Sequence, residues 1–187
     1  MSTIKYDREK LRELALYIAE KMQGERYFGA TILNKALFYC DFEWFRETGK
    51  PMTGATYQKL NYGPAPREIL SVIKSLCNDG SAEIITRATY VGRQKRLVPK
   101  RRAKLDEHFK PEQIALVNEI ISSLTDVTAG SISAFSHQHI GWRVAEYRED
   151  IPYVAVHLAD QGALPSDVKR GLVLAKEHGW LKAVAAQ

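Results

Sequence analysis

The chain has 187 residues, of which 45% are hydrophobic and 26% are charged. These proportions suit one ordinary hydrophobic core, so we expect a single domain over residues 1–187. The two cysteines are too few for the disulfide framework of a small secreted protein. No window approaches the roughly 18 apolar residues of a membrane span, and the first residues lack the apolar core of a signal peptide. We therefore expect a cytoplasmic protein without a membrane segment.

Apolar periodicity predicts three helices in the first 80 residues. The first covers about residues 7–22, and the second ends near Gly49. A short extended piece is expected at residues 55–60, after which Pro64 and Pro66 are expected to begin the third helix. The apolar face predicted for this third helix comprises Ile69, Leu70, Ile73, Leu76 and Cys77.

The pattern changes after residue 81. Residues 82–90 and 94–98 are rich in Ile, Thr, Tyr and Val around Gly92, which predicts a β-hairpin. Another helix is expected to start at Lys110-Pro111. Shorter helices are predicted at about residues 129–137, 141–146, 152–160 and 165–178. The sequence thus predicts a mainly α fold with a small β-hairpin (α+β): a compact multi-helix single domain with a winged-helix-like hairpin and a C-terminal helical extension at about residues 164–187.

The second predicted helix carries two polar residues in largely apolar surroundings. Asn34 and Asp41 are seven residues apart, two helical turns, and therefore project from the same side of the helix. A buried amide or carboxylate without a partner is destabilising by roughly 1 to 3 kcal/mol, so each of them needs a polar neighbour. We expect the following loop, bent by Gly54, Gly63 and Pro64, to supply that neighbour. The alternative is that both residues line a site for a partner or a ligand.

Several short motifs are distributed between residues 33 and 153. The N-terminal motifs are Leu33-Asn34-Lys35-Ala36-Leu37-Phe38-Tyr39-Cys40-Asp41, Thr53-Gly54-Ala55-Thr56-Tyr57 and Asn61-Tyr62-Gly63-Pro64. The C-terminal motifs are Phe135-Ser136-His137, Gly141-Trp142 and Ile151-Pro152-Tyr153. Together they resemble the Panacea domain of SocA-like antitoxins from bacterial and phage toxin–antitoxin pairs, over about residues 14–153. Cys40 departs from the family, which more often carries alanine or another small residue there.

The resemblance implies a set of residues that either stabilise the fold or bind a partner. These family-motif residues are Asn34, Lys35, Asp41, Gly54, Tyr57, Gly63, Pro64, His137 and Trp142. The resemblance also implies a non-catalytic protein, without a cofactor, that binds and silences a cognate toxin encoded beside it or delivers that toxin for proteolysis. Because toxins paired with this family are of unrelated kinds, it does not identify the toxin.

A competing hypothesis comes from the distribution of charge. The segment 87–104 contains eight basic residues and no acidic one, whereas the other 19 basic residues are outnumbered by 22 acidic ones. The candidate basic docking surface consists of Arg87, Arg93, Lys95, Arg96, Lys100, Arg101, Arg102 and Lys104. It is interpreted as a solvated hairpin, as a docking surface for an acidic partner, or as the wing of a winged-helix-like nucleic-acid-binding regulator. Each interpretation predicts that charge reversal at Arg101 and Arg102 leaves the fold intact.

Four features of the sequence weaken the DNA-binding and enzymatic interpretations. A helix-turn-helix joins its helices by about 3 to 4 residues, whereas residues 49–64 separate the second and third predicted helices here. His137 and His139 are two residues apart and lack a nearby cysteine or carboxylate, so no metal site is predicted. Cys40 lies on an apolar stripe and is interpreted as a packing residue, and no phosphate-binding loop is present. The sequence therefore predicts neither an enzyme nor a metalloprotein.

Overall fold

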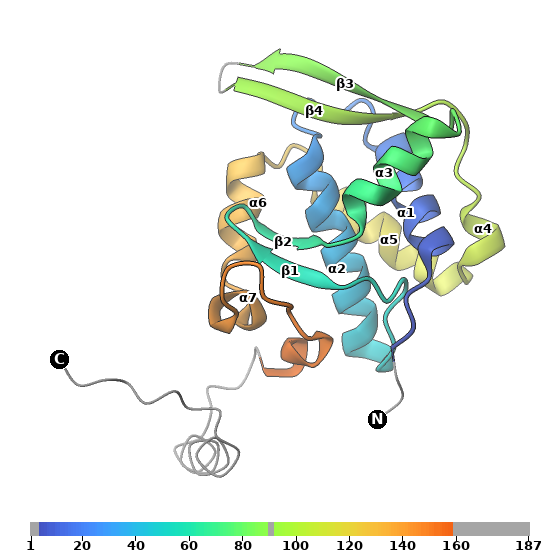
Figure 1. Ribbon diagram of the computed structural model, residues 1–187. Coiled ribbons are helices and arrows are strands. Elements are labelled where there is room, and N and C mark those ends of the chain that lie inside the picture. Colours follow the sequence, from blue (N-terminus) through green and yellow to red (C-terminus); the bar gives the residue numbers. More distant parts are fainter. Residues whose placement is uncertain (1–3, 90–91, 159–187) are drawn as a thin grey trace, which may run out of the picture.

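Helix α2 (Ala30–Thr48) is the central element of the computed structural model, which describes residues 4–89 and 92–158 (Figure 1). Its side chains are buried around most of its circumference. The surrounding elements are α1 (Arg8–Lys21), α5 (Pro111–Ser123), α6 (Ala129–Ser136) and the hairpin of β1 (Tyr57–Leu60) and β2 (Gly63–Pro66). The helix ends at Gly49, whose φ of +72° is the left-handed conformation that glycine adopts without strain. The second helix predicted from the sequence is therefore confirmed, and it forms the core on which the other elements pack.

Helix α1 (Arg8–Lys21) packs against α2 through its apolar stripe of Leu11, Leu14 and Ile18. Asp7 is its N-cap, and its Oδ1 accepts a hydrogen bond from the Lys10 backbone N–H at 3.0 Å. Both the predicted extent of this helix and its side chain periodicity are confirmed.

The segment between α2 and α3 forms a β-hairpin. Strand β1 (Tyr57–Leu60) pairs antiparallel with strand β2 (Gly63–Pro66), with Tyr57 opposite Pro66 and Leu60 opposite Gly63. The prediction that Pro64 and Pro66 begin a helix is wrong, and α3 starts at Ile69. A proline drives the residue before it into extended backbone, so two alternating prolines favour a strand over a helix. The hairpin also takes the place of the tight turn that a helix-turn-helix requires.

Helix α3 (Ile69–Asn78) buries a different stripe from the one predicted. Ile69 and Leu76 are buried as expected, but Leu70 is 78% exposed and Val72 is fully buried instead. Ile73 and Cys77 are half-buried. The positions 69, 72 and 76 follow the helical period, which points Leu70 to the opposite side.

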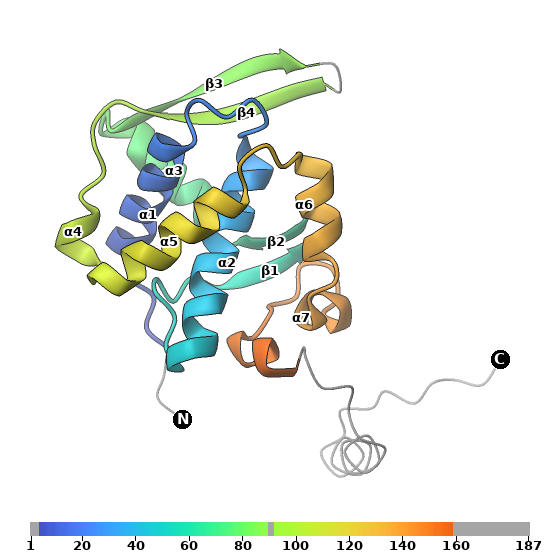
Figure 2. The ribbon, with the colours of Figure 1, turned by 180° about the vertical axis from the view of Figure 1, so that it is seen from behind.

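Strands β3 (Ala82–Thr89) and β4 (Gly92–Pro99) form the predicted hairpin, which lies across one end of the helices (Figures 1 and 2). They pair in register from Ala82 opposite Pro99 to Thr89 opposite Gly92. Leu97 and Ala82 anchor the base of the hairpin in the core. This element, predicted from alternation and β-branched residues, is confirmed.

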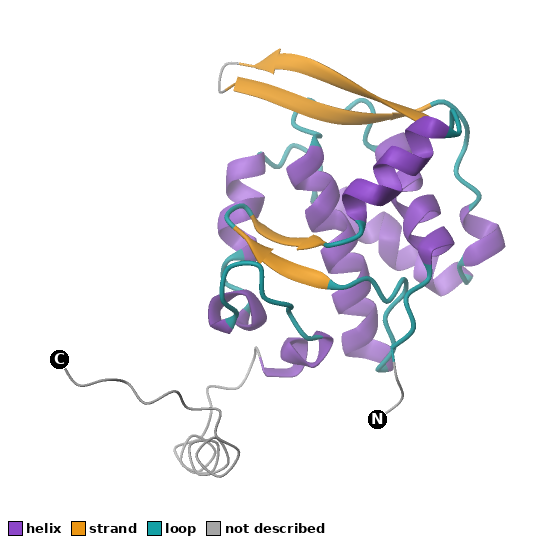
Figure 3. Cartoon of the chain, viewed as in Figure 1, coloured by secondary structure: helices purple, strands orange, loops and turns teal. Residues whose placement is uncertain are grey.

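The remaining elements close the other side of α2. They are α4 (Leu105–His108), α5 (Pro111–Ser123), α6 (Ala129–Ser136), α7 (Ile140–Val144) and the 3₁₀-helix η1 (Tyr153–Leu158). The sequence did not predict α4, and the helix predicted at residues 165–178 lies outside the described residues. The fold is mainly helical with two small antiparallel hairpins around one core, which confirms the predicted class (Figure 3). Among the described residues, none of the helices combines the length and apolar character needed to cross a membrane.

Candidate partner-binding site

Asp41 fixes the loop that leads into the β1–β2 hairpin. Its side chain is completely buried on α2. Oδ1 accepts from the Thr53 backbone N–H at 2.6 Å, and Oδ2 accepts from the Thr53 hydroxyl and from the Tyr57 hydroxyl, the latter at 2.9 Å. Burial raises the pKa of Asp41, while the donors from Thr53 and Tyr57 oppose that rise. The prediction that Asp41 hydrogen-bonds the loop is confirmed.

Lys35, and not Asn34, makes the second connection between α2 and the hairpin. The Lys35 side chain is 1% exposed, and its Nζ donates to the Pro64 carbonyl at 2.8 Å. Burial lowers the pKa of this ammonium to about 7. Asn34 is only half-buried, and its side chain makes no hydrogen bond to any described residue, so the predicted bond from Asn34 to the loop is wrong.

Two motif glycines allow this close packing. Gly63 has a φ of +94°, and a Cβ at this position would clash with the Ser136 hydroxyl and with the end of the Lys35 side chain. Gly54 has a φ of +69°, and a Cβ there would clash with the Lys5 backbone carbonyl. Both positions therefore require glycine for its conformation and for its size.

Trp142 on α7 holds the turn end of the hairpin. Its Nε1 donates to the Leu60 carbonyl at 3.1 Å, and the His137 ring stacks on the indole with centroids 3.8 Å apart. Lys59 Nζ lies 4.3 Å from the centroid of the indole ring and donates to the Ala145 carbonyl at 2.9 Å. Partial burial and the charges of Lys35 and Lys59 lower the pKa of His137.

These contacts bring together motif residues from three separated segments. Lys35 and Asp41 come from α2, Tyr57 and the Gly63-Pro64 pair from the hairpin, and the His137–Trp142 stack from α6 and α7. At the turn that they hold, Tyr62 is 73% exposed. The arrangement therefore presents one aromatic side chain to solvent on a backbone that is tied to the core on both sides.

The chain matches the family model described as antitoxin SocA-like, Panacea domain, over residues 33–143. It belongs to the SocA-like Panacea family. No curated protein and no solved structure shows significant similarity to the chain. The matched residues contain most of α2, the β1–β2 hairpin and Trp142, so the hydrogen bonds of Lys35, Asp41 and Trp142 to the hairpin lie within the matched part.

Two residues of this Panacea domain that hold the site were not recognised from the sequence. Lys59 gave no signal because a single basic residue in a strand is ordinary. His139 was considered only as a metal ligand, but its ring packs in T-shaped arrangements with Phe38 and Phe42, and its Nδ1 accepts from the Gly141 N–H at 3.1 Å. Burial lowers the pKa of His139 to about 4, so it is a neutral packing residue. Among the described residues, no group of histidine, cysteine and carboxylate side chains could hold a metal ion.

The candidate basic docking surface is divided by the structure. Arg96 is buried, and its guanidinium donates to the carbonyls of Gln23 and Glu25 in the loop that follows α1. Arg101 donates to both carboxylate oxygens of the buried Glu13 and to the Ser81 hydroxyl. These two residues hold the fold together, and the prediction that charge reversal at Arg101 is harmless conflicts with this contact.

The other six residues of the basic surface are exposed, and they fall into two groups. Lys100 pairs with Glu83 at 2.7 Å and Lys104 pairs with Glu107 at 3.4 Å, so acidic neighbours balance their charges. Arg87, Arg93, Lys95 and Arg102 form no ion pair with a described residue. Only half of the basic surface thus remains as uncompensated positive charge.

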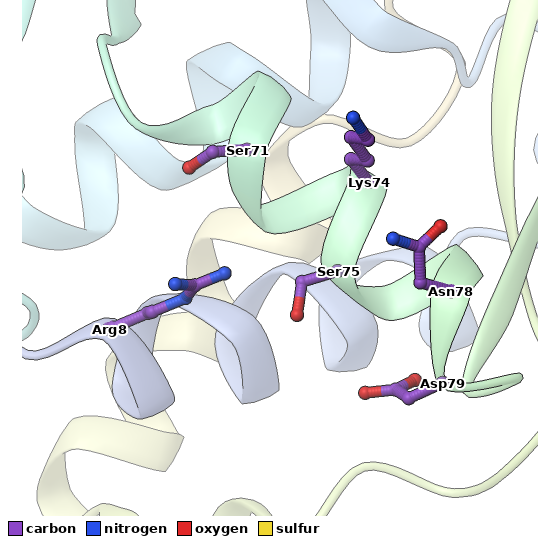
Figure 4. A pocket seen from close by; sticks show the side chains of 6 residues that line it. All are labelled: Arg8, Ser71, Lys74, Ser75, Asn78 and Asp79. Carbon is purple, nitrogen blue, oxygen red and sulfur yellow. The ribbon is translucent and has the colours of Figure 1, made fainter.

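A polar pocket of about 460 Å³ lies between α1 and α3, lined by Arg8, Ser71, Lys74, Ser75, Asn78 and Asp79 (Figure 4). Arg12 donates to two of these lining residues, at the Ser75 hydroxyl and the Asp79 carboxylate. Hydrogen bonds from Ser81 and from Arg12 hold the pKa of Asp79 well below its usual range. Because Lys74 points away from Arg8, the basic groups do not converge on a ligand position, and the cluster links the two helices.

Proposed function

We propose that this protein is a non-catalytic antitoxin that neutralises a cognate toxin, encoded beside it, by direct binding. Membership of the SocA-like Panacea family supports an antitoxin role and implies a toxin partner. We further propose that it acts in the cytoplasm without a cofactor and that residues 1–187 work as one Panacea-type domain. Occlusion of the toxin in a stable complex, alone or followed by delivery of the toxin to a protease, requires no covalent chemistry.

The observation that carries the proposed interface is the exposed Tyr62 on a firmly held turn. Tyrosine supplies a large contact area with few rotatable bonds, which makes it a frequent energetic centre of protein interfaces. Leu60 and Pro64 on either side of the turn are bound by Trp142 and Lys35, so little conformational entropy remains to be lost when a partner binds.

Exposed apolar side chains extend this surface onto the neighbouring helices. Phe135 on α6 is 58% exposed, and Val144 at the end of α7 is 69% exposed. Helix α6 packs against β2 and α7 is joined to β1 by the Trp142 hydrogen bond. Large exposed apolar side chains gathered on adjoining elements are a feature of partner-binding surfaces. We define the toxin-binding surface by Tyr62, Phe135 and Val144.

Co-expression with the product of the adjacent reading frame tests this proposal. We expect the wild-type chain to rescue growth and to co-purify with the toxin. Tyr62→Ala should abolish rescue while leaving the melting temperature unchanged, because the Tyr62 side chain contacts mainly solvent. Leu70→Ala is the matched control, since Leu70 is equally exposed but lies on α3. Equal rescue by both variants would place the interface elsewhere, and absence of both toxicity and complex would contradict the antitoxin role.

A further inference from the structure

Three cations on the β3–β4 hairpin have no structural role in the described part of the chain. Arg87 on β3 and Arg93 and Lys95 on β4 are exposed, and none forms an ion pair with a described residue. We call these three residues the ribbon cations. They remain after Arg96 and Arg101 are assigned to the fold and after Lys100 and Lys104 are matched with acidic neighbours.

The ribbon cations project from both faces of the hairpin. Residues opposite each other in an antiparallel ladder share a face, and successive residues alternate between faces. Arg93 and Lys95, opposite Ala88 and Thr86, therefore lie on the outer face. Arg87, opposite Gln94, lies on the inner face, toward the loop that joins α1 to α2.

The inner face is anchored so that the hairpin holds a defined position. Gln94 Nε2 donates to the Tyr27 carbonyl at 2.9 Å, and the Arg96 guanidinium lies 5.6 Å from the centre of the Phe28 ring. The two strands lie across one end of the domain and reach its edge, where they are not covered by a helix (Figures 1 and 2). A fixed two-stranded ribbon thus carries positive charge on both of its faces.

We propose that the β3–β4 hairpin binds duplex DNA, with the outer face of the ribbon turned toward the major groove and the ribbon cations directed at its phosphates. The major groove of B-form DNA is about 12 Å wide and admits a two-stranded ribbon, and both of its walls carry phosphates. The major groove of duplex RNA is too deep and narrow for this fit.

This interaction is independent of the sequence of the DNA, because phosphate contacts position a protein but do not distinguish bases. Each neutralised phosphate releases condensed counterions, so the logarithm of the affinity falls with the logarithm of salt concentration by about 0.9 per contact. Three contacts correspond to a slope of about −2.7 from the ribbon cations. The DNA-binding function adds to the proposed toxin binding and does not depend on it.

Fluorescence anisotropy of the full chain with a labelled 20-base-pair DNA duplex tests the proposal. We expect binding at 50 mM salt that weakens steeply toward 200 mM salt. The variant R87Q/R93Q/K95Q should weaken binding at least about tenfold at 50 mM salt and reduce the magnitude of the salt slope by about 2.7. The control K5Q/K50Q/R143Q removes the same charge from exposed positions distant from the hairpin, and its affinity should stay within about threefold of wild type.

Three results would overturn the proposal. The first is that the chain does not bind DNA at 50 mM salt, and the second is that the two triple variants lose equal DNA affinity. The third is that duplex RNA or poly-glutamate binds the chain as tightly as DNA does, or more tightly. Circular dichroism melting checks that the variants are folded. If the triple variant melts early, R93Q/K95Q tests the outer face alone, where no described contact to the domain is lost, and it should reduce the slope by about 1.8.

Discussion

The Lys35 ammonium, buried on α2, donates to the carbonyl of Pro64 and so joins the central helix to strand β2. A buried lysine with a single hydrogen-bond acceptor is unusual, because the charged form is poorly solvated there. Its pKa falls to about 7, compared with 10.5 for an exposed lysine, because burial disfavours the charge. The connection that holds the candidate interface therefore titrates near neutral pH.

The first expectation is that Lys35 makes the stability of the fold depend on pH. The unfolded chain keeps this proton up to about pH 10.5, whereas the folded chain releases it near pH 7. Between these values the unfolded state binds more protons, so raising the pH favours folding by up to about 1.4 kcal/mol per pH unit. Urea unfolding at pH 7.0, 8.0 and 9.0 should show this rise for wild type and a flatter profile for Lys35→Met. Parallel profiles would contradict a depressed pKa of Lys35.

A second expectation concerns the carboxylate of Asp41. Asp41→Ala should lower the free energy of unfolding by about 2 to 4 kcal/mol, because Thr53 and Tyr57 would keep buried donors without an acceptor. Toxin neutralisation should be lost together with stability. Asn34→Ala is the control from the same helix, and it should change stability by less than about 1 kcal/mol because Asn34 is half-buried. Chemical denaturation of both variants measures the two free energies of unfolding. Similar decreases in the two variants would show that Asn34 also stabilises the loop.

Gly63 provides a third expectation. Gly63→Ala should destabilise the fold by more than about 2 kcal/mol, because the added methyl group meets Lys35 and Ser136 in addition to the unfavourable positive φ. Gly80→Ala is a matched control with a similar φ of +74° and no atom within 4 Å of the added Cβ. The control should lose only about 1 kcal/mol. Thermal melts of the two variants separate steric crowding from backbone strain, and equal shifts would rule out crowding at Gly63.

The fourth expectation compares two adjacent arginines. Arg101→Glu should destabilise the fold by about 2 to 4 kcal/mol, because it places a second carboxylate against the buried Glu13. Arg102→Glu should change stability by less than about 0.5 kcal/mol, since the side chain of Arg102 is exposed and makes no ion pair with a described residue. Differential scanning calorimetry gives both values, and a stable Arg101→Glu protein would restore the sequence-based expectation that both charges are dispensable.

Elements with local signals could be predicted from the amino-acid sequence. The extents of α1 and α2 follow from caps, glycine and apolar periodicity, and the β3–β4 hairpin follows from β-branched residues around Gly92. The motif residues also led to the SocA-like Panacea family before any contact between them was known, because the family pattern is a property of the order of residues.

The tertiary structure alone decided which polar groups are joined. Asn34 and Lys35 are neighbours on one helix, and only the position of β2 shows that Lys35 meets Pro64 while Asn34 meets no partner among the described residues. Likewise, the equal charges of Arg96 and Lys95 have different roles because adjacent residues of a strand face opposite sides. Hydrogen bonds and ion pairs between distant segments depend on how the helices and strands pack. A local sequence pattern does not contain the spatial distance between two such segments.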